Sequence, residues 1–412
     1  LGDVYKRQVK YISAIGVLLL LLGNFSSCTK MDDYLKYTDG KEILYIGKPE
    51  AMQMRSGRER VQFYGMLIDP KITRLRITYN MGKDVIDLPV QRQEGAEVFT
   101  YDIPLKEGIY NFVVQTFDDE GHASVPESLI GSSYGSIYES TLYNRGISSV
   151  KCENNSTTIS WSTADSHSPY VHIWYTDVNE QERMVQVEQS EQETVLEEYK
   201  SMSGFRMKTY YLPDTAAVDI FDIEANVEAD ETLTGTVMKN ATEPFVRQDE
   251  GTEKSGVLKD WEYTPNLLTQ NGGRTGTFYE ASAGKTFINM STLNYDSAIE
   301  NGKIWQKVTL PAGTYEFSFN VNTSKGNNLN PYGAVVVADV FPDTDQVAAT
   351  ALASVNWGRT TGTKTLSFTL DEETTLLLGW VASMGEKSAD IRINAVALNK
   401  IHKINTIEKE VE

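Results

Sequence analysis

The sequence has little cysteine and little histidine, which excludes several classes of site. Its 412 residues include two Cys and four His. A disulfide framework or a structural zinc site needs more of these residues, in closer spacing. Basic residues are also outnumbered, with 38 Lys and Arg against 57 Asp and Glu and a formal net charge of −19. Because this surplus repels a phosphate backbone, we expect no nucleic-acid partner.

Long apolar runs are scarce as well. The longest, Tyr11 to Leu22, has about a dozen residues, whereas a helix that spans a bilayer needs about 20. It follows Lys10 and precedes Ser26-Ser27-Cys28. A charged start, a short apolar core and small residues before a Cys are typical of a secretory signal. We therefore expect residues 1–27 to comprise a read-through, Leu1 to Gln8, and a signal peptide that starts at Val9.

The end of this signal resembles a bacterial lipobox, although Phe25 replaces the usual Leu. The resemblance implies cleavage before Cys28 and lipidation of Cys28. Asp32-Asp33 resembles the surface-export signal of Bacteroides-type lipoproteins, which implies a surface-exposed outer-membrane lipoprotein that contacts the membrane through its lipid alone. The alternative is a secreted chain without an anchor. With Cys28 acylated, Cys152 has no disulfide partner, and we expect it to be buried and unreactive.

Alternating apolar and polar residues predict an all-β protein. Val61, Phe63 and Leu67 share one strand face, and the spacing of turns such as Glu107-Gly108 suits an antiparallel sandwich. A second module repeats the pattern around Trp161, and a third has the clearest strands, with Pro311-Ala312-Gly313 as a hairpin turn. The expected order is a lipidated stalk (28–41), sandwich modules (42–145 and 146–223), a linker (224–255), a jelly roll (256–402) and a polar tail (403–412).

One segment of the second module is ambiguous. Residues 188–200 are rich in Glu and Gln and fit a helix as well as a strand, and we interpret 194–199 as a strand.

The modules resemble known families. Residues 108–124 resemble a late strand and turn of a fibronectin type III or immunoglobulin-like module, and Tyr134 to Arg145 resembles a signature of Bacteroides-type surface lipoproteins whose N-terminal region is a domain of unknown function. Trp305 to Val308 and Leu310 to Tyr315 resemble a second domain of unknown function, similar to galactose-binding-like jelly rolls. These resemblances imply two immunoglobulin-like sandwiches, a jelly roll and a setting of polysaccharide capture.

Two loops of the third region carry the residue types that bind sugars. Neutral sugars present apolar C–H faces beside hydroxyl groups, so their sites pair aromatic rings with polar side chains. Trp357 beside Arg359 is the predicted stacking platform, and the predicted polar partners are Tyr332, Asn327, Asn328 and Asn330. The alternative is that Trp357 packs in the core.

No sequence pattern identifies a catalytic or metal site. Gly131-Ser132-Ser133-Tyr134-Gly135 matches the G-x-S-x-G nucleophile elbow, but no apolar helical stripe follows it. Galactose-binding-like folds often hold a structural calcium ion, and no oxygen-ligand spacing identifies one here, so that question stays open. We expect no cofactor and no enzyme activity.

The leading hypothesis is a non-catalytic lipoprotein that binds glycan through its jelly roll, beside transporter or other surface-complex partners. A structural or adhesion protein that binds another protein is the alternative, and a hydrolase ranks third.

Overall fold

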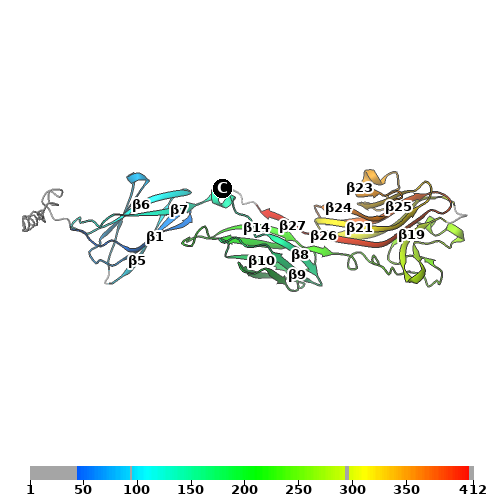
Figure 1. Ribbon diagram of the computed structural model, residues 1–412, viewed down its shortest axis with the longest axis horizontal. Helices are drawn as coiled ribbons and strands as arrows, with labels where there is room; N and C mark the ends of the chain where they lie inside the picture. Colours follow the sequence, from blue (N-terminus) through cyan, green and yellow to red (C-terminus); the bar gives the residue numbers. More distant parts are fainter. Residues whose placement is uncertain (1–43, 93–94, 293–296, 408–412) are drawn as a thin grey trace, which may run out of the picture. The chain divides into compact units, whose positions relative to one another are not determined.

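In a computed structural model that describes residues 44–92, 95–292 and 297–407, the chain forms two compact units. One comprises Leu1–Gly135 with Ala216–Val218, and the other Ser136–Thr215 with Asp219–Glu412. Strands dominate both units, which confirms the predicted all-β class (Figure 1). The described helices include none with the length and apolar character of a membrane span.

The first unit is a sandwich, here called sandwich 1. Its strands follow the order β4-β3-β6-β7-β1-β2-β5, in which β1 pairs antiparallel with β2 and parallel with β7. Alternate residues of β2, including Val61, Phe63 and Leu67, face a core completed by Phe112. The strands are β1 (Glu50–Arg58), β2 (Arg60–Leu67), β3 (Arg74–Tyr79), β4 (Asp84–Pro89), β5 (Glu97–Pro104), β6 (Gly108–Phe117) and β7 (Glu127–Tyr134).

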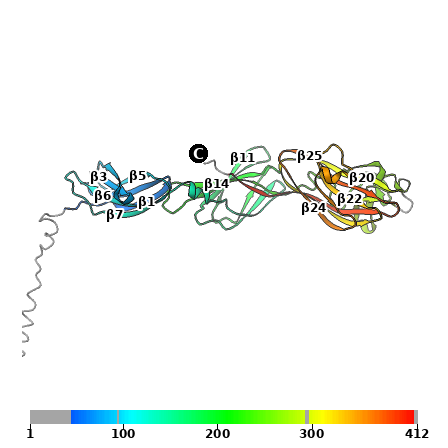
Figure 2. The same cartoon turned by 90° about the horizontal axis from the view of Figure 1, so that it is seen from above.

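The second unit starts with the short helix α2 (Ser136–Ser140) and a second sandwich, here called sandwich 2. Its sheets are β12-β9-β8 and β11-β10-β13-β14-β27, and β11 and β14 of the latter are labelled in Figure 2. Between the sheets pack Ile159, Trp161, Ile173 and Met207. The ambiguous segment is a strand at β12. The strands are β8 (Ile147–Glu153), β9 (Ser156–Trp161), β10 (Tyr170–Thr176), β11 (Glu182–Glu188), β12 (Glu193–Leu196), β13 (Phe205–Tyr211), β14 (Phe221–Glu228) and β27 (Lys403–Ile407).

The jelly roll packs a sheet of β15, β26, β19, β18, β16, β21 and β24 against another of β17-β20-β25-β22-β23. The first sheet is continuous with β12-β9-β8 of sandwich 2, because β15 pairs in parallel with β8. Tyr315, Phe317, Phe319 and Trp380 fill the space between the two jelly-roll sheets. The elements are β15 (Asp230–Thr232), β16 (Ser255–Gly256), β17 (Glu262–Tyr263), β18 (Phe278–Glu280), β19 (Thr286–Ser291), β20 (Ile299–Leu310), β21 (Gly313–Lys325), β22 (Asn330–Val336), α3 (Val347–Thr350), β23 (Ala351–Asn356), β24 (Gly362–Leu370), β25 (Thr374–Met384) and β26 (Asp390–Ile401).

The linker predicted at 224–255 is corrected by the structure. Its first residues belong to β14, which pairs with β13 up to Val227, and β15 follows at once. The rest of the segment packs on the jelly roll, because its isolated apolar residues enter the jelly-roll core. These residues are Leu233, Met238, Ala241 and Phe245.

The polar tail predicted at 403–412 is corrected too. Residues 403–407 form β27, which pairs antiparallel with β14 from Glu224 to Glu228. The chain thus leaves sandwich 2 after β14, builds the jelly roll, and returns to the edge of sandwich 2. In topological terms, the jelly roll is an insertion between two neighbouring strands of sandwich 2.

Candidate functional site

A polar basin of about 290 Å³ opens on the outer face of the jelly-roll sheet that holds β18, β19 and β26. Side chains of a strand alternate between faces, so the residues between the core residues Ile288, Met290, Ile391 and Ile393 point outward. We call this hollow the β19–β26 basin. It is lined by Ser255, Thr275, Tyr279, Asn289, Ser291, Thr292, Lys325, Ser388, Ala389, Asp390 and Arg392.

Strand register places the charged residues of the basin side by side. Asp390 stands opposite Lys325 of β21 on one side and opposite Ser291 of β19 on the other. Arg392 lies two residues after Asp390 on the same face of β26 and stands opposite Asn289 of β19. Two polar rows therefore cross three strands, and neither row is formed by neighbours in the sequence.

Asp390 is the most enclosed charge in the basin, with a side chain that is 10% exposed. Arg392 donates from Nε to Asp390 Oδ1 at 3.1 Å, and its Nη2 lies 2.9 Å from Oδ2. Lys325 Nζ is 3.8 Å from Oδ2. Burial raises the pKa of Asp390 above its usual value, and this effect exceeds the lowering caused by Arg392 and Lys325.

An aromatic ring and an amide stand beside these charges. The guanidinium carbon of Arg392 lies 4.0 Å from the centre of the Tyr279 ring, a cation–π arrangement that fixes both side chains. Asn289 is buried and donates from Nδ2 to the Gly276 carbonyl at 2.9 Å and to Ser291 Oγ at 3.2 Å. The basin combines a ring, amide and hydroxyl groups, and charges of both signs.

The predicted stacking platform at Trp357 is wrong. Trp357 is 4% exposed, packs edge-on against Phe319 with ring centres 5.4 Å apart, and donates from Nε1 to Ser324 Oγ at 3.1 Å. The alternative of a core residue therefore holds. A tryptophan in a loop is buried here because the loop after β23 folds back over the end of β21, where Ser324 Oγ donates to the Gly358 carbonyl at 2.7 Å.

The other predicted residues do lie together, at the loops that join β21 to β22 and β23 to β24. Asn356 donates to Asn330 Oδ1 at 2.7 Å and stands opposite Tyr332 in the strand register. The polar head groups of Arg359 and Asn327 are 3.5 Å apart. Asn328 is exposed. Tyr332 is partly buried against a small apolar cluster that includes Phe341 and Val381. These loops supply polar groups beside the half-buried ring of Tyr332.

The sequence prediction missed Tyr279, Asn289, Asp390 and Arg392. Polar residues do alternate with Ile or Met at 288–291 and 390–393, which is a signal for a polar strand face. That signal cannot show which other strands share the face. Lys325 is the link between the two regions, because it lines the basin and lies two residues before Asn327 of the predicted site.

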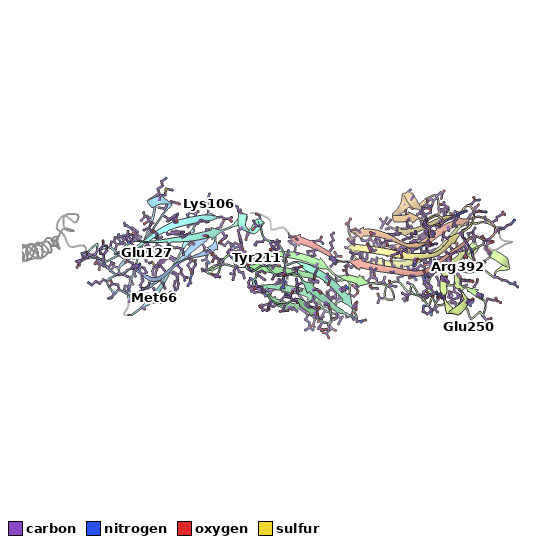
Figure 3. All side chains as sticks on the ribbon, viewed as in Figure 1. Met66, Lys106, Glu127, Tyr211, Glu250 and Arg392 are labelled. Carbon is purple, nitrogen blue, oxygen red and sulfur yellow. The ribbon has the colours of Figure 1, made fainter. Side chains whose placement is uncertain are left out.

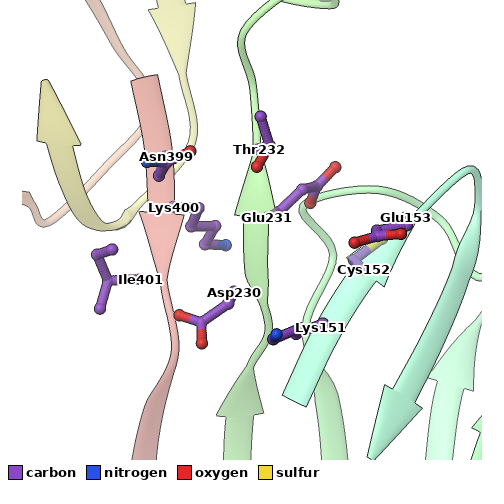
Figure 4. A pocket seen from close by; sticks show the side chains of 9 residues that line it. All are labelled: Lys151, Cys152, Glu153, Asp230, Glu231, Thr232, Asn399, Lys400 and Ile401. Atoms are coloured by element: carbon purple, nitrogen blue, oxygen red, sulfur yellow. The ribbon is translucent and has the colours of Figure 1, made fainter. Parts of the chain in front are cut away.

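A second cavity, of about 300 Å³, lies where sandwich 2 meets the jelly roll (Figure 4). It is lined by residues of β8, β15 and β26, including Lys151, Asp230 and Lys400. Buried Lys400 lies 3.3 Å from Glu228 Oε2 and donates to the Met202 carbonyl at 3.2 Å. Glu231 in turn accepts the Met202 N–H at 2.9 Å. These charges tie the turn before β13 to the jelly roll, so their role is structural.

Cys152 also lines this second cavity. It is free and buried, as predicted. Burial raises the pKa of its thiol, so the reactive thiolate is disfavoured.

One group in the described part of the chain could share a cation. Asp118, Glu120 and His122 of sandwich 1 hold their ligand atoms within 4.8 Å of one another. Burial raises the pKa of Asp118, but hydrogen bonds from His122 and Glu120 outweigh this and keep the pKa below its usual value. The same bonds close the turn, with Asp118 Oδ1 accepting both backbone N–H groups at 2.8 and 3.0 Å. These hydrogen bonds stabilise the turn.

The G-x-S-x-G match has a packing explanation. Ser133 lies within β7 instead of at a strand-to-helix elbow, is buried, and donates to the Leu105 carbonyl at 2.8 Å. A Cβ on Gly131 would stand 2.7 Å from Met54 Cβ, so this position requires glycine. Cys28, the predicted lipidation site, lies outside the described residues.

Two family models match the sequence. Residues 28–221 match a domain of unknown function (DUF4998), and residues 239–379 match another domain of unknown function (DUF5013). No curated protein matches the chain. Neither family description states an activity.

Solved structures similar to the chain include fragments of two chicken proteins, CNTN1 and tenascin. The CNTN1 FN1–FN3 domains share 14% identity at a TM-score of 0.28, over 44% of this chain and 65% of that one. The chain thus covers less than two thirds of that fragment. A segment of two fibronectin type III domains from tenascin shares 18% identity at a TM-score of 0.18, over 44% of this chain and 95% of that one.

Proposed function

We propose that the chain is a non-catalytic surface lipoprotein that binds glycan in the β19–β26 basin of its jelly roll. The observation that carries this proposal is the basin itself, where the Tyr279 ring stands among amide, hydroxyl and charged groups on rigid strands. Binding sites on strands hold their geometry better than sites on loops. Arg392, which marks the basin in Figure 3, fixes the ring of Tyr279 before any ligand arrives.

The anchoring part of the proposal rests on the sequence. A signal peptide followed by Cys28 would attach the chain to the outer membrane by a lipid, and sandwich 1 follows this lipid first in chain order. In this setting, captured polysaccharide would be passed to transporter or other surface-complex partners. Labelling of intact cells with radioactive palmitate, compared with a Cys28→Ala variant, tests the anchor independently of glycan binding.

Tyr279→Ala is expected to weaken glycan binding about tenfold, because a lost stacking contact of roughly 1 to 1.5 kcal/mol corresponds to that factor. Affinity electrophoresis of the full chain against a panel of neutral and charged polysaccharides gives the measurement. Tyr45→Ala, an exposed tyrosine of sandwich 1, is the matched control and should bind as the unsubstituted chain does. Failure of every polysaccharide to bind, or equal loss in both variants, would contradict the proposal.

A further inference from the structure

The β19–β26 basin has the opposite charge sign to the chain as a whole. The chain carries a formal net charge of −19. The lining of the basin holds two cations, Lys325 and Arg392, and one carboxylate, Asp390. Its other lining residues are uncharged at neutral pH, so the basin carries a local surplus of one positive charge. A positive hollow on an acidic protein is a specific feature and not a consequence of composition.

The three charges are not equivalent. Asp390 is enclosed and is engaged by the Arg392 guanidinium through Nε and Nη2, so these two groups largely neutralise each other. Lys325 lies farther from Asp390, at 3.8 Å, and its side chain is 66% exposed. The ammonium of Lys325 is therefore the positive group that an incoming ligand meets at the rim.

The neighbours of Lys325 show how a ligand would be oriented. Asp390 stands opposite Lys325 in the register of β21 and β26, and Ser291 follows on β19. The adjacent row holds Arg392 and Asn289. The hydroxyl groups of a sugar ring placed against Tyr279 would find polar partners in both rows. One edge of this ring would face the side of the basin where Lys325 lies. A negative group on that edge would gain an ion pair that a hydroxyl group could not form.

We propose that the basin selects glycans that carry an anionic group, either the carboxylate of a uronic acid or a sulfate ester, and that Lys325 pairs with this group. This inference rests on the proposed function, because it assigns a ligand class to the same basin. Carboxylate and sulfate share the chemistry that matters, which is a compact anion with several acceptor oxygens. Salt screens charges farther apart than about 8 Å at physiological ionic strength, so the local cation outweighs the distant acidic surface.

The test compares polysaccharides that differ only in charge. Polygalacturonate is paired with its methyl-esterified form, and dextran sulfate with dextran. Biolayer interferometry of the full chain at physiological ionic strength should show binding at least about fivefold tighter for the anionic member of a pair, as an ion pair at a partly exposed site supplies. The pair that shows the difference identifies carboxylate or sulfate as the recognised group.

Lys325→Gln should remove most of that difference, because glutamine keeps a polar side chain of similar length but carries no charge. Lys307→Gln, an exposed lysine of β20 outside the basin, is the matched control and should preserve the difference. Equal binding of both members of each pair, or a Lys325→Gln variant that keeps the preference, would overturn the inference while leaving glycan binding intact. Equally tight binding of double-stranded DNA would also overturn it, by showing general affinity for polyanions. If no polysaccharide binds at all, the proposed function fails as well.

Discussion

Trp380→Ala is expected to cost the jelly roll about 3 to 5 kcal/mol of unfolding free energy, the usual range for removal of a fully buried tryptophan. Trp380 is 0% exposed and stacks on Trp261 with ring centres 5.1 Å apart. It also contacts Phe319 edge-on at 5.5 Å. Alanine would leave a cavity at the meeting point of both sheets. Denaturant unfolding followed by near-ultraviolet circular dichroism measures the loss.

Trp380→Phe is the matched control. The indole N–H of Trp380 is buried and has no hydrogen-bond partner among the described residues, so phenylalanine removes an unsatisfied donor while it keeps most of the apolar volume. The expected loss is less than about 2 kcal/mol, since the cavity left by phenylalanine is small. Equal losses in the two variants would show that the ring packing around Trp380 does not stabilise the core as argued.

Arg145→Ala is expected to destabilise sandwich 2 by roughly 3 kcal/mol, because it leaves buried carbonyl groups without their charged donor. Arg145 is 3% exposed. Its guanidinium donates to the carbonyls of Glu188, at 3.0 Å, and Glu191, and its carbon lies 5.1 Å from the Trp161 ring centre. Burial lowers the pKa of Arg145, although arginine stays protonated in proteins.

The readout for Arg145 should be local as well as global. Hydrogen exchange of residues 188–192 should accelerate in Arg145→Ala, because their turn loses its anchor. Arg145→Lys keeps the charge but lacks the planar fork that reaches two carbonyls, so its exchange should be nearly as fast. Unchanged protection of this turn in both variants would contradict the assigned role.

The strands of all three domains could be predicted because their signal is local. Alternation over β21 or β6 needs only the residues of that strand, and the core contacts of Phe317 and Phe112 follow from it. The prediction of a linker at 224–255 was wrong because burial there depends on distant residues. The buried residues of this segment, such as Met238 and Phe245, follow no period, and their burial depends on a jelly roll that is built from later sequence. β27 was missed because an exposed edge strand pairs through its backbone, which composition does not reveal.

The candidate site also combines features that local sequence predicts with features that depend on distant residues. Residue types in a loop suggested Trp357, but the backbone path that buries it depends on the Ser324 hydroxyl and the Phe319 ring. The basin required knowledge of which strands are neighbours, because Tyr279 and Arg392 are far apart in the sequence and meet only across the sheet. Local pattern therefore predicted the exposed face of each strand, and only the sheet register assembled these faces into a site.

The insertion of the jelly roll between β14 and β27 has a mechanical consequence. The chain crosses from sandwich 2 to the jelly roll between Glu228 and Asp230 and crosses back between Ile401 and Lys403. Near these crossings β15 pairs with β26, and β14 pairs with β27. β8 of sandwich 2 also pairs in parallel with β15. A tensile load on the jelly roll would thus be shared by two backbone segments and by this strand pairing, and all of them would have to yield before the domains part. A pull on a polymer bound to the jelly roll would therefore be resisted by two covalent chain connections to sandwich 2 instead of one.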